Sequence, residues 1–180
     1  MEVIVVARPE DADGLVADAY STLLARKPDA VLGLATGSTP LGVYRELIRR
    51  HREEGLSFAR ATSFNLDEYV GLPAGHPERY LTFIEREFTG QVDFAPGAVH
   101  GPDGLADDLE AAARAYDRAI QDAGGIDIQI LGIGADGHLA FNMPGSSLAS
   151  RTRLKTLTRK TREDNARFFG GDIDQVPLHS

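Results

Sequence analysis

Residues 126–142 constrain the fold more than any other part of the chain. The first half of this segment carries isoleucine and leucine residues that alternate and then run together, which is typical of a strand buried within a sheet. Glycines then allow sharp turns, and between them stand Asp136 and His138. α/β enzymes commonly present a proton-transfer pair at the end of a buried strand. The competing interpretation is that Asp136 caps the next segment and His138 is an ordinary loop histidine.

The composition of the 180 residues argues against several classes of protein. A formal net charge of -8 is unfavourable for binding nucleic acid or a membrane surface, because both require clustered positive charge. The absence of cysteine excludes disulfides, thiolate nucleophiles and cysteine-based metal sites. No apolar run approaches ~20 residues, and the first residues turn acidic too quickly for a signal peptide. We expect a soluble cytoplasmic protein with a single domain over residues 1–180.

Predicted strands alternate with predicted helices along the chain. Strands are expected at 2–7, 30–35 and 61–66, before the one that begins at 126, with a connection at 93–103. Helices are expected at 10–26, 41–54, 77–88 and 105–123. This order favours an α/β fold: a Rossmann-like layered sheet, mostly parallel, with helices on both faces.

The predicted strand at 30–35 runs directly into a turn and a helix. Thr39 suits the cap of this helix and Pro40 its first turn. A strand, a glycine turn and a helix start direct free backbone N–H groups and the positive end of the helix dipole at one place, where a phosphate binds well. The turn lacks the spacing and the lysine of a nucleotide P-loop, and an ordinary capped turn is the alternative.

Two adjacent carboxylates, Asp67 and Glu68, follow the predicted strand at 61–66. Such a pair is usually a solvated turn. The ends of parallel strands converge at one edge of a sheet, however, so Asp67 is expected to face the same cleft as the 36–39 turn and the Asp136–His138 pair.

Three separate motifs resemble one known family. FNLDEYVGLP at 64–73, GADGHLAFN at 134–142 and PGSSLASRTRLKTLT at 144–158 closely resemble the glucosamine-6-phosphate deaminases, also called glucosamine-6-phosphate isomerases. The second motif is also similar to the related 6-phosphogluconolactonases. The first motif favours the deaminase, because the lactonases usually have a D-E-R-type sequence there. The lactonase is therefore the alternative enzyme.

The resemblance implies a hydrolase-class deaminase of amino sugar catabolism, which converts glucosamine 6-phosphate to fructose 6-phosphate and ammonia. It implies no metal and no organic cofactor. By its motif, His138 would shuttle a proton as the sugar ring opens, assisted by Asp136, and Asp67 would remove the C2 proton. The residues implied to hold the phosphate are Gly37, Ser38, Thr39 and Arg167.

The resemblance also implies allosteric control in a homo-oligomer. The bacterial hexamers bind N-acetylglucosamine 6-phosphate at a subunit interface, and the positions that match this site are Ser146, Arg153, Lys155 and Thr156. A small sugar phosphate is the expected partner, and neither nucleic acid nor a membrane is expected.

Two features depart from the family pattern. The family loop normally reads A-F-N-E-P, and Met143 stands at the position of its glutamate. A thioether cannot stabilise an imidazolium as a carboxylate does, so a rate loss on the order of 10²–10⁴-fold is expected. Family members also continue well beyond the segment that contains Val176 and Pro177, so we expect a domain that lacks the family's C-terminal part. An impaired sugar-phosphate-binding protein or fragment is the alternative without catalysis.

Overall fold

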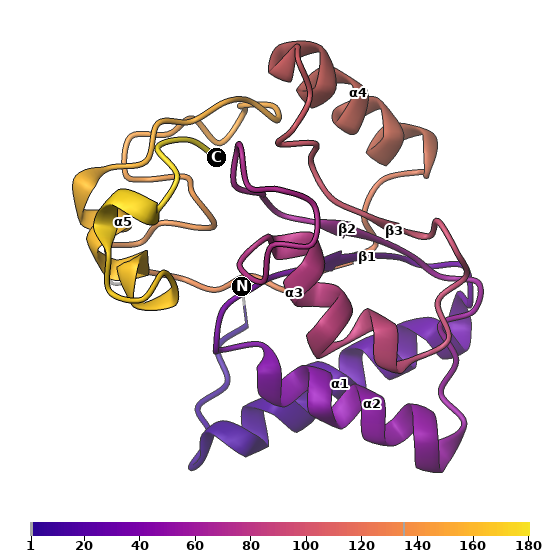
Figure 1. Ribbon diagram of the computed structural model, residues 1–180. Coiled ribbons are helices and arrows are strands. Elements are labelled where there is room, and N and C mark those ends of the chain that lie inside the picture. The colour runs from indigo at the N-terminus through magenta and orange to yellow at the C-terminus, as the bar shows by residue number, and fades with distance from the viewer. Residues whose placement is uncertain (1, 135) are drawn as a thin grey trace.

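A parallel sheet with helices on both faces forms the centre of the molecule (Figure 1). The computed structural model describes residues 2–134 and 136–180. Within this part of the chain, the sheet has the strand order β3-β2-β1-β4, and every pairing is parallel. The predicted α/β class with a parallel, layered sheet is therefore confirmed. The strands are β1 (Val31–Leu34), β2 (Thr62–Asn65), β3 (Val99–His100) and β4 (Ile128–Gln129).

Three helices cover one face of the sheet, namely α1 (Pro9–Arg26), α2 (Leu41–Glu54) and α3 (Tyr80–Glu87). The main hydrophobic core lies between these helices and β1. Tyr44 of α2 stacks on Phe88 with ring centroids 4.8 Å apart, and Phe58 meets Phe88 edge-on at 5.4 Å. Burial of such rings contributes most of the packing energy of this layer. The predicted helix at 41–54 is confirmed to the residue.

The opposite face of the sheet is covered by α4 (Leu109–Asp122). Side chains alternate between the two faces of a strand, so Val31 points toward α4 while Leu32 belongs to the main core. Tyr116 of α4 packs with Val31 and Phe64, and its hydroxyl donates to the Asn65 carbonyl at 2.9 Å. This bond fixes α4 against the end of β2.

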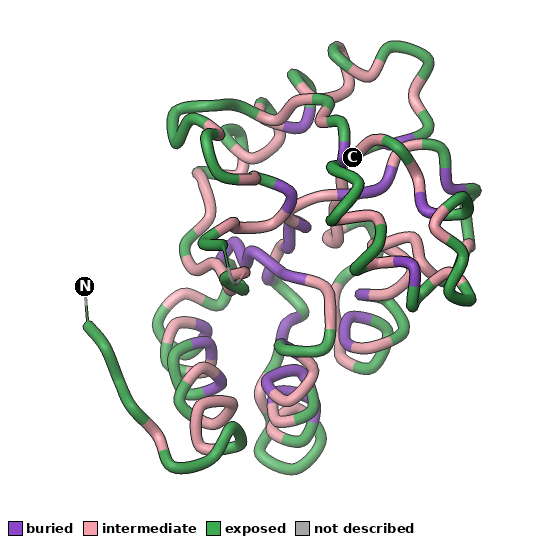
Figure 2. The backbone as a smooth tube through the Cα atoms, turned by 90° about the vertical axis from the view of Figure 1, so that its left-hand side faces the viewer, coloured by how far each residue is buried: buried purple, intermediate pink, exposed green. Residues whose placement is uncertain are grey.

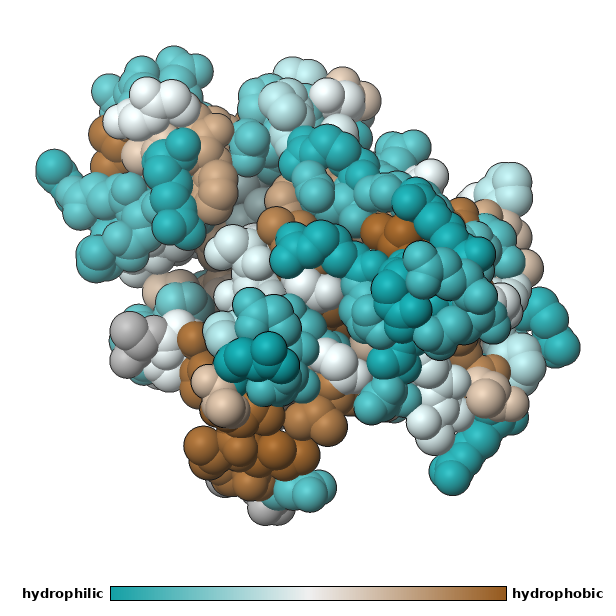
Figure 3. Space-filling view, turned by 90° about the horizontal axis from the view of Figure 1, so that it is seen from below, coloured by the Kyte–Doolittle hydropathy of each residue, from teal (hydrophilic) through white to brown (hydrophobic). Residues whose placement is uncertain are grey.

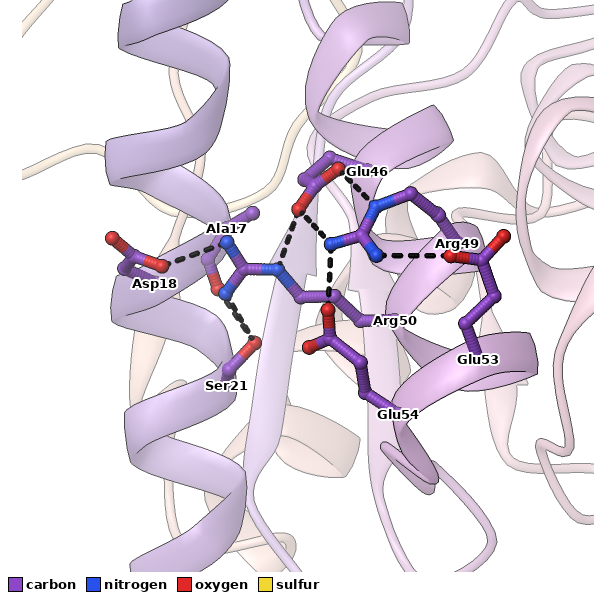
Figure 4. Close-up of polar contacts among 8 residues, drawn as sticks. All are labelled: Ala17, Asp18, Ser21, Glu46, Arg49, Arg50, Glu53 and Glu54. Atoms are coloured by element: carbon purple, nitrogen blue, oxygen red, sulfur yellow. Dashed lines mark hydrogen bonds and ion pairs between the residues drawn. The ribbon is translucent and has the colours of Figure 1, made fainter.

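A surface network of charged side chains joins α1 to α2 (Figure 4). The Arg50 guanidinium contacts Asp18 of α1 at 2.7 Å and Glu46 of its own helix at 2.8 Å. Arg49 pairs with Glu46 from the other side, also at 2.8 Å. Exposed pairs of this kind stabilise a protein by less than about 1 kcal/mol each, so the network supports the helix pair but does not create it.

Residues 139–180 lie beside the sheet and contain the short helix α5 (Arg159–Asn165) with 3-10 turns at Ala166–Phe168 and Ile173–Gln175 (Figure 1). A second core forms where this region meets the loop that follows β2, around Tyr69, Phe141 and Val176. A backbone bridge between Thr156 and His179 ties the end of the chain to it. The second core places residues from three distant segments around the end of β2.

The predicted strand at 2–7 is wrong. These residues run along the surface without pairing to the sheet, and Figure 2 shows the segment as an exposed tube apart from the helices. Val5 is 92% exposed. Figure 3 shows apolar side chains gathered at one margin of the underside, and Val3 and Ile4 are also strongly exposed. β-branched residues favour strands only where a neighbouring strand offers partners.

Two other predicted segments differ from the structure. Only Ile128 and Gln129 of the strand expected from 126 pair with β1, while Leu131 and Ile133 are exposed. The connection expected at 93–103 contains the short strand β3, which pairs with β2. Apolar content predicts burial, but the length of a strand depends on the length of its partner.

Candidate active site

Asp67 lies two residues after the end of β2, in a partly buried position. The ring centroids of Tyr69 and Tyr80 are 4.8 Å apart, and Phe141 stacks on Tyr80 at 5.9 Å. Burial and, next, the charge of Glu68 raise the pKa of the Asp67 carboxyl to about 7, while the Phe141 N–H opposes the shift. Asp67 can therefore exchange a proton near neutral pH.

Glu68 is buried and acts as a structural anchor. Its carboxylate accepts the backbone N–H groups of Tyr69 at 2.9 Å, Tyr80 at 2.9 Å and Leu81 at 3.0 Å. Tyr80 and Leu81 form the first turn of α3, where free N–H groups and the helix dipole favour a negative charge. The carboxylate pair thus divides into a partly exposed Asp67 and an anchoring Glu68.

Tyr80 connects the ends of β1 and β2. Burial and, next, the charge of Asp67 raise the pKa of its hydroxyl well above the usual range, whereas a hydrogen bond with the Thr36 side chain lowers it. Thr36 follows β1 closely and opens the 36–39 turn. The start of this turn therefore lies near the Tyr80 hydroxyl.

The 36–39 turn differs in one respect from its predicted form. Gly37 has a φ of 93°, a conformation that favours glycine. Helix α2 begins at Leu41 after Pro40, and no side chain caps it, so the predicted Thr39 cap is wrong. The Ser38 carbonyl instead accepts the Leu41 N–H at 3.4 Å. The backbone N–H groups at the start of α2 are thus not satisfied by a capping side chain.

Asp136 and His138 contact each other directly. His138 Nδ1 lies 2.5 Å from Asp136 Oδ1, and the His138 backbone N–H donates to the same oxygen at 3.2 Å. These backbone and side-chain bonds, in that order, lower the pKa of the Asp136 carboxyl. Both side chains are open to solvent, with 35% of His138 and 51% of Asp136 exposed. An ionised carboxylate on Nδ1 leaves Nε2 free for proton transfer.

Gly134 permits this arrangement of the histidine. A Cβ atom added to Gly134 would lie 2.2 Å from His138 Cε1, so any larger residue would displace the ring. The Gly134 N–H also donates to the His138 carbonyl at 2.9 Å. The glycine therefore fixes the imidazole close to the backbone.

A cavity of about 430 Å³ opens beside Asp67. Gly137 and Leu139, the neighbours of His138, line its wall, although Asp136 and His138 themselves do not. The 36–39 turn is not among the lining residues either, so the cavity is not the single cleft that was predicted for Asp67, this turn and the Asp136–His138 pair. Among the lining side chains that the sequence had pointed to are Asp67, Met143, Ser146, Arg153 and Lys155.

The structure thus places most of the predicted regulatory positions in the same cavity as Asp67. Arg153 Nη2 donates to Asn142 Oδ1 at 2.8 Å, which links it to the loop that carries Phe141. Thr156 lies outside the lining and pairs with His179. Arg167 also lies outside, because its guanidinium stacks over the Phe168 ring at 4.6 Å from the centroid.

Comparison with known proteins assigns this arrangement to a family. Residues 9–167 match the family described as glucosamine-6-phosphate isomerases/6-phosphogluconolactonase. The chain belongs to this family. It is 67% identical to a glucosamine-6-phosphate deaminase of Mycolicibacterium smegmatis and 66% identical to one of Beutenbergia cavernae. Each match covers 99% of this chain and 69% of the relative.

Solved structures agree with the assignment to the glucosamine-6-phosphate isomerase/6-phosphogluconolactonase family. A monomeric glucosamine-6-phosphate deaminase superposes with a TM-score of 0.95 at 45% identity, over 99% of this chain and 74% of that protein. A 6-phosphogluconolactonase from Thermotoga maritima gives 0.69 at 24% identity, over 86% of this chain and 68% of that protein, which shows a shared fold. In the described part of this family member, no helix has the length and hydrophobicity to cross a membrane.

Within this isomerase/lactonase family member, the position of Met143 is well defined. Its sulfur accepts a hydrogen bond from the Thr161 hydroxyl at 3.5 Å, and the side chain lines the cavity beside Asp67. Within the described residues, no cluster of three or more histidine, aspartate or glutamate side chains is arranged to hold a metal ion. The ionisable side chains that line the cavity include those of Asp67, Arg153 and Lys155.

Two residues around Asp67 were not singled out for the site by sequence reasoning. Tyr80 falls within the helix predicted at 77–88, and Phe141 falls within the motif at 134–142. Their rings stack on each other, and the Phe141 backbone N–H donates to the Asp67 carboxyl. Phe141 could have been noted from its place beside His138, but nothing local predicts its contact with Tyr80.

Proposed function

We propose that the chain converts glucosamine 6-phosphate to fructose 6-phosphate and ammonia. The observation that carries this proposal is the Asp67 carboxyl, which has a pKa of about 7 and borders a cavity large enough for a sugar phosphate. The high identity to several proteins named glucosamine-6-phosphate deaminase supports the same substrate.

The first step is the opening of the sugar ring. Nε2 of His138 takes the proton of the C1 hydroxyl and returns it to the ring oxygen as the C1–O5 bond breaks. Asp136 supports this role, because its carboxylate on Nδ1 stabilises the imidazolium that forms. The exposed position of the pair leaves room for a ligand to approach Nε2.

The second step is the transfer of a proton from C2 to C1. Ionised Asp67 removes the C2 proton of the open-chain aldehyde, and the electrons move onto O1, which takes a proton from the amino group to give an enolamine. The same carboxyl then delivers its proton to C1 as the nitrogen lone pair forms the C=N bond. A carboxyl with a pKa near 7 suits both halves of this step, because it accepts and releases the proton with similar ease. The product is an imine at C2.

The third step releases ammonia. Water adds to the C2 imine, the C–N bond breaks, and a ketone remains, so the reaction combines an isomerisation with a hydrolytic deamination. In this proposal, the backbone N–H groups of Gly37, Ser38 and Thr39 hold the phosphate at the start of α2. Arg167 completes the phosphate site by moving from the Phe168 ring to the bound anion.

The experiment that tests the proposal is an assay of ammonia and fructose 6-phosphate release from glucosamine 6-phosphate by the purified chain. Turnover that is lost in Asp67→Asn and kept in Asp107→Asn, an exposed carboxylate elsewhere, supports it. Hydrolysis of 6-phosphogluconolactone without deamination would support the lactonase. Binding of glucosamine 6-phosphate without turnover, unchanged in Met143→Glu, would indicate a binding protein.

A regulatory role for Ser146, Arg153 and Lys155 is a second proposal, favoured by their place in the cavity that Asp67 borders. A sugar phosphate bound to the two cations would reach the 139–143 loop through the Arg153–Asn142 bond. Addition of N-acetylglucosamine 6-phosphate should then alter the substrate-velocity curve, and Arg153→Ala should abolish this effect. An unchanged curve in the unsubstituted protein would contradict regulation.

We also propose a cytoplasmic homo-oligomer, for which a hexamer is the family precedent. One solved relative is described as monomeric, so the assembly has to be measured on this chain. Sedimentation of the purified protein distinguishes a monomer from a hexamer directly.

A further inference from the structure

Glu68 differs from an ordinary loop carboxylate in its burial and in the number of bonds it makes. Only 3% of the residue is exposed, and its two oxygens accept three backbone N–H groups. The cation of Arg79 lies 3.7 Å from Oε2. A buried carboxylate is retained only where such partners replace water, so the bonds around Glu68 form a rigid unit.

This unit connects the two elements that surround Asp67. On one side, Glu68 follows Asp67 in the chain, so that any movement of its backbone moves Asp67. On the other side, it holds the N–H groups of Tyr80 and Leu81 and thereby fixes the start of α3. Tyr80 in turn packs against the rings of Tyr69 and Phe141, and the Phe141 backbone N–H donates to the Asp67 carboxyl.

We infer that Glu68 is a positioning residue, which holds Asp67 and the ring of Tyr80 in the geometry required for proton transfer by tying the end of β2 to the first turn of α3. The inference rests on the proposed role of Asp67. A misplacement of about 1 Å in a reacting group can lower a rate by ~10²-fold, which is why a fixed anchor beside Asp67 matters.

Glu68 also acts on Asp67 through its charge. Burial raises the pKa of Glu68 itself, while the three N–H groups and then Arg79 oppose this shift. Its negative charge in turn disfavours the ionised form of Asp67. Tyr69, Tyr80 and Tyr116 also interact with Asp67; a phenol is neutral near pH 7, and burial raises the pKa of all three further. Arg153 and Lys155 line the adjacent cavity.

Two substitutions of Glu68 distinguish the effect of its hydrogen bonds from the effect of its negative charge. Glu68→Gln keeps an oxygen for the N–H groups of Tyr69 and Tyr80 but removes the charge. The acid limb of its pH–rate profile between about pH 5 and pH 9 should move to lower pH, with KM little changed. Glu68→Ala removes the anchor, and its kcat should fall by about 10–100-fold. A residue needed only for folding would alter the yield of folded protein but not the position of the acid limb.

Glu78→Gln is the matched control. It removes a carboxylate from the same loop just before α3, and within the described residues the Glu78 side chain makes no hydrogen bond. Its pH–rate profile should match that of the unsubstituted protein. An acid limb that stays in place in Glu68→Gln together with an unchanged kcat in Glu68→Ala overturns the inference.

Two measurements on the unsubstituted protein test the inference without requiring enzymatic turnover or a folded variant. In a carboxyl-carbon NMR titration of the unsubstituted protein, the signals of Asp67 and Glu68 should show shared inflections, because the two groups interact. Amide exchange should show Tyr80 and Leu81 as strongly protected. Independent titrations with rapid exchange of both amides overturn the inference even where no deaminase activity is found. Shared inflections without activity would contradict only the proposed function.

Discussion

Two loops of this protein follow parallel strands and carry an aspartate, yet they create opposite environments. The first, residues 66–72 after β2, packs through Tyr69 against Tyr80 and Phe141, and the pKa of Asp67 rises to about 7. The second, residues 136–143 after β4, leaves Asp136 half exposed, and the bonds from His138 lower its pKa. One carboxyl is prepared to exchange protons, and the other to remain ionised.

The difference shows that neighbouring elements, and not the position after a strand, decide what an aspartate can do. β2 is an inner strand with partners on both sides, and α3 and α4 pack near its end. Within the described residues, β4 is an edge strand with two paired residues, and Leu131 and Ile133 beyond it are exposed. Desolvation therefore acts on Asp67, whereas hydrogen bonding acts on Asp136.

The largest expected effect comes from Asp67→Asn, which removes the proton acceptor and keeps the shape of the side chain. We predict that kcat for glucosamine 6-phosphate deamination falls by about 10²–10⁴-fold. The assay should be run above pH 7, where Asp67 is ionised. Activity within about tenfold of the unsubstituted protein would show that the buried carboxyl of the first loop is not the base.

The second prediction tests the Asp136–His138 pair by a substitution at Gly134, which lies against the His138 ring. Gly134→Ala introduces a Cβ against the His138 ring, so the imidazole must move, and kcat should fall by about 10²-fold. Gly132→Ala is the matched control, because nothing lies within 4 Å of a Cβ at that position. The acid limb set by Asp67 should not shift in either variant. Equal activities of the two variants would contradict the need for a fixed imidazole.

The third prediction concerns stability. The raised pKa means that the ionised Asp67 carboxyl is disfavoured in the folded state, so the folded protein loses stability as the pH rises from about 4 through about 7. Asp67→Asn should therefore raise the free energy of unfolding at about pH 8 by roughly 1–3 kcal/mol. The gain should shrink toward pH ~4. Urea unfolding at the two pH values measures it, and a constant difference would contradict the shift.

The smallest effect is expected from substitutions of Tyr80. The pH–rate profile of the unsubstituted protein should have an acid midpoint near pH 7. Tyr80→Phe keeps the ring and should leave this midpoint close to its original value, whereas Tyr80→Ala admits water to Asp67 and should lower it. A midpoint that is the same in both variants would show that the Tyr80 ring does not raise the pKa of Asp67.

The helices were predictable because their signals are local. The helix at 41–54 presents apolar residues with helical spacing, and Gly55, at a φ of 76°, ends it, so the prediction was confirmed to the residue. The strand expected at 2–7 has similarly apolar residues but lies exposed, since no described strand pairs with it. Strand pairing requires a distant partner, which a sequence window does not contain.

In the candidate site, too, some features follow from local sequence patterns and others depend on distant partners. Asp67, Asp136 and His138 could be selected from the sequence, because polar residues after buried strands and among glycines are local patterns. The anchoring role of Glu68 could not, because its partners belong to a helix that begins twelve residues later. The contact between Arg153 and Asn142 likewise depends on how two loops pack.

By itself, the sequence determined the alternation of strands and helices, the motifs that mark the family and the identity of the candidate proton-transfer groups. The tertiary structure decided which carboxyl is buried, which is anchored and which is exposed. The physical reason is that a pKa depends on the dielectric environment and the charges within a few ångströms, and packing assembles these from segments far apart in the chain.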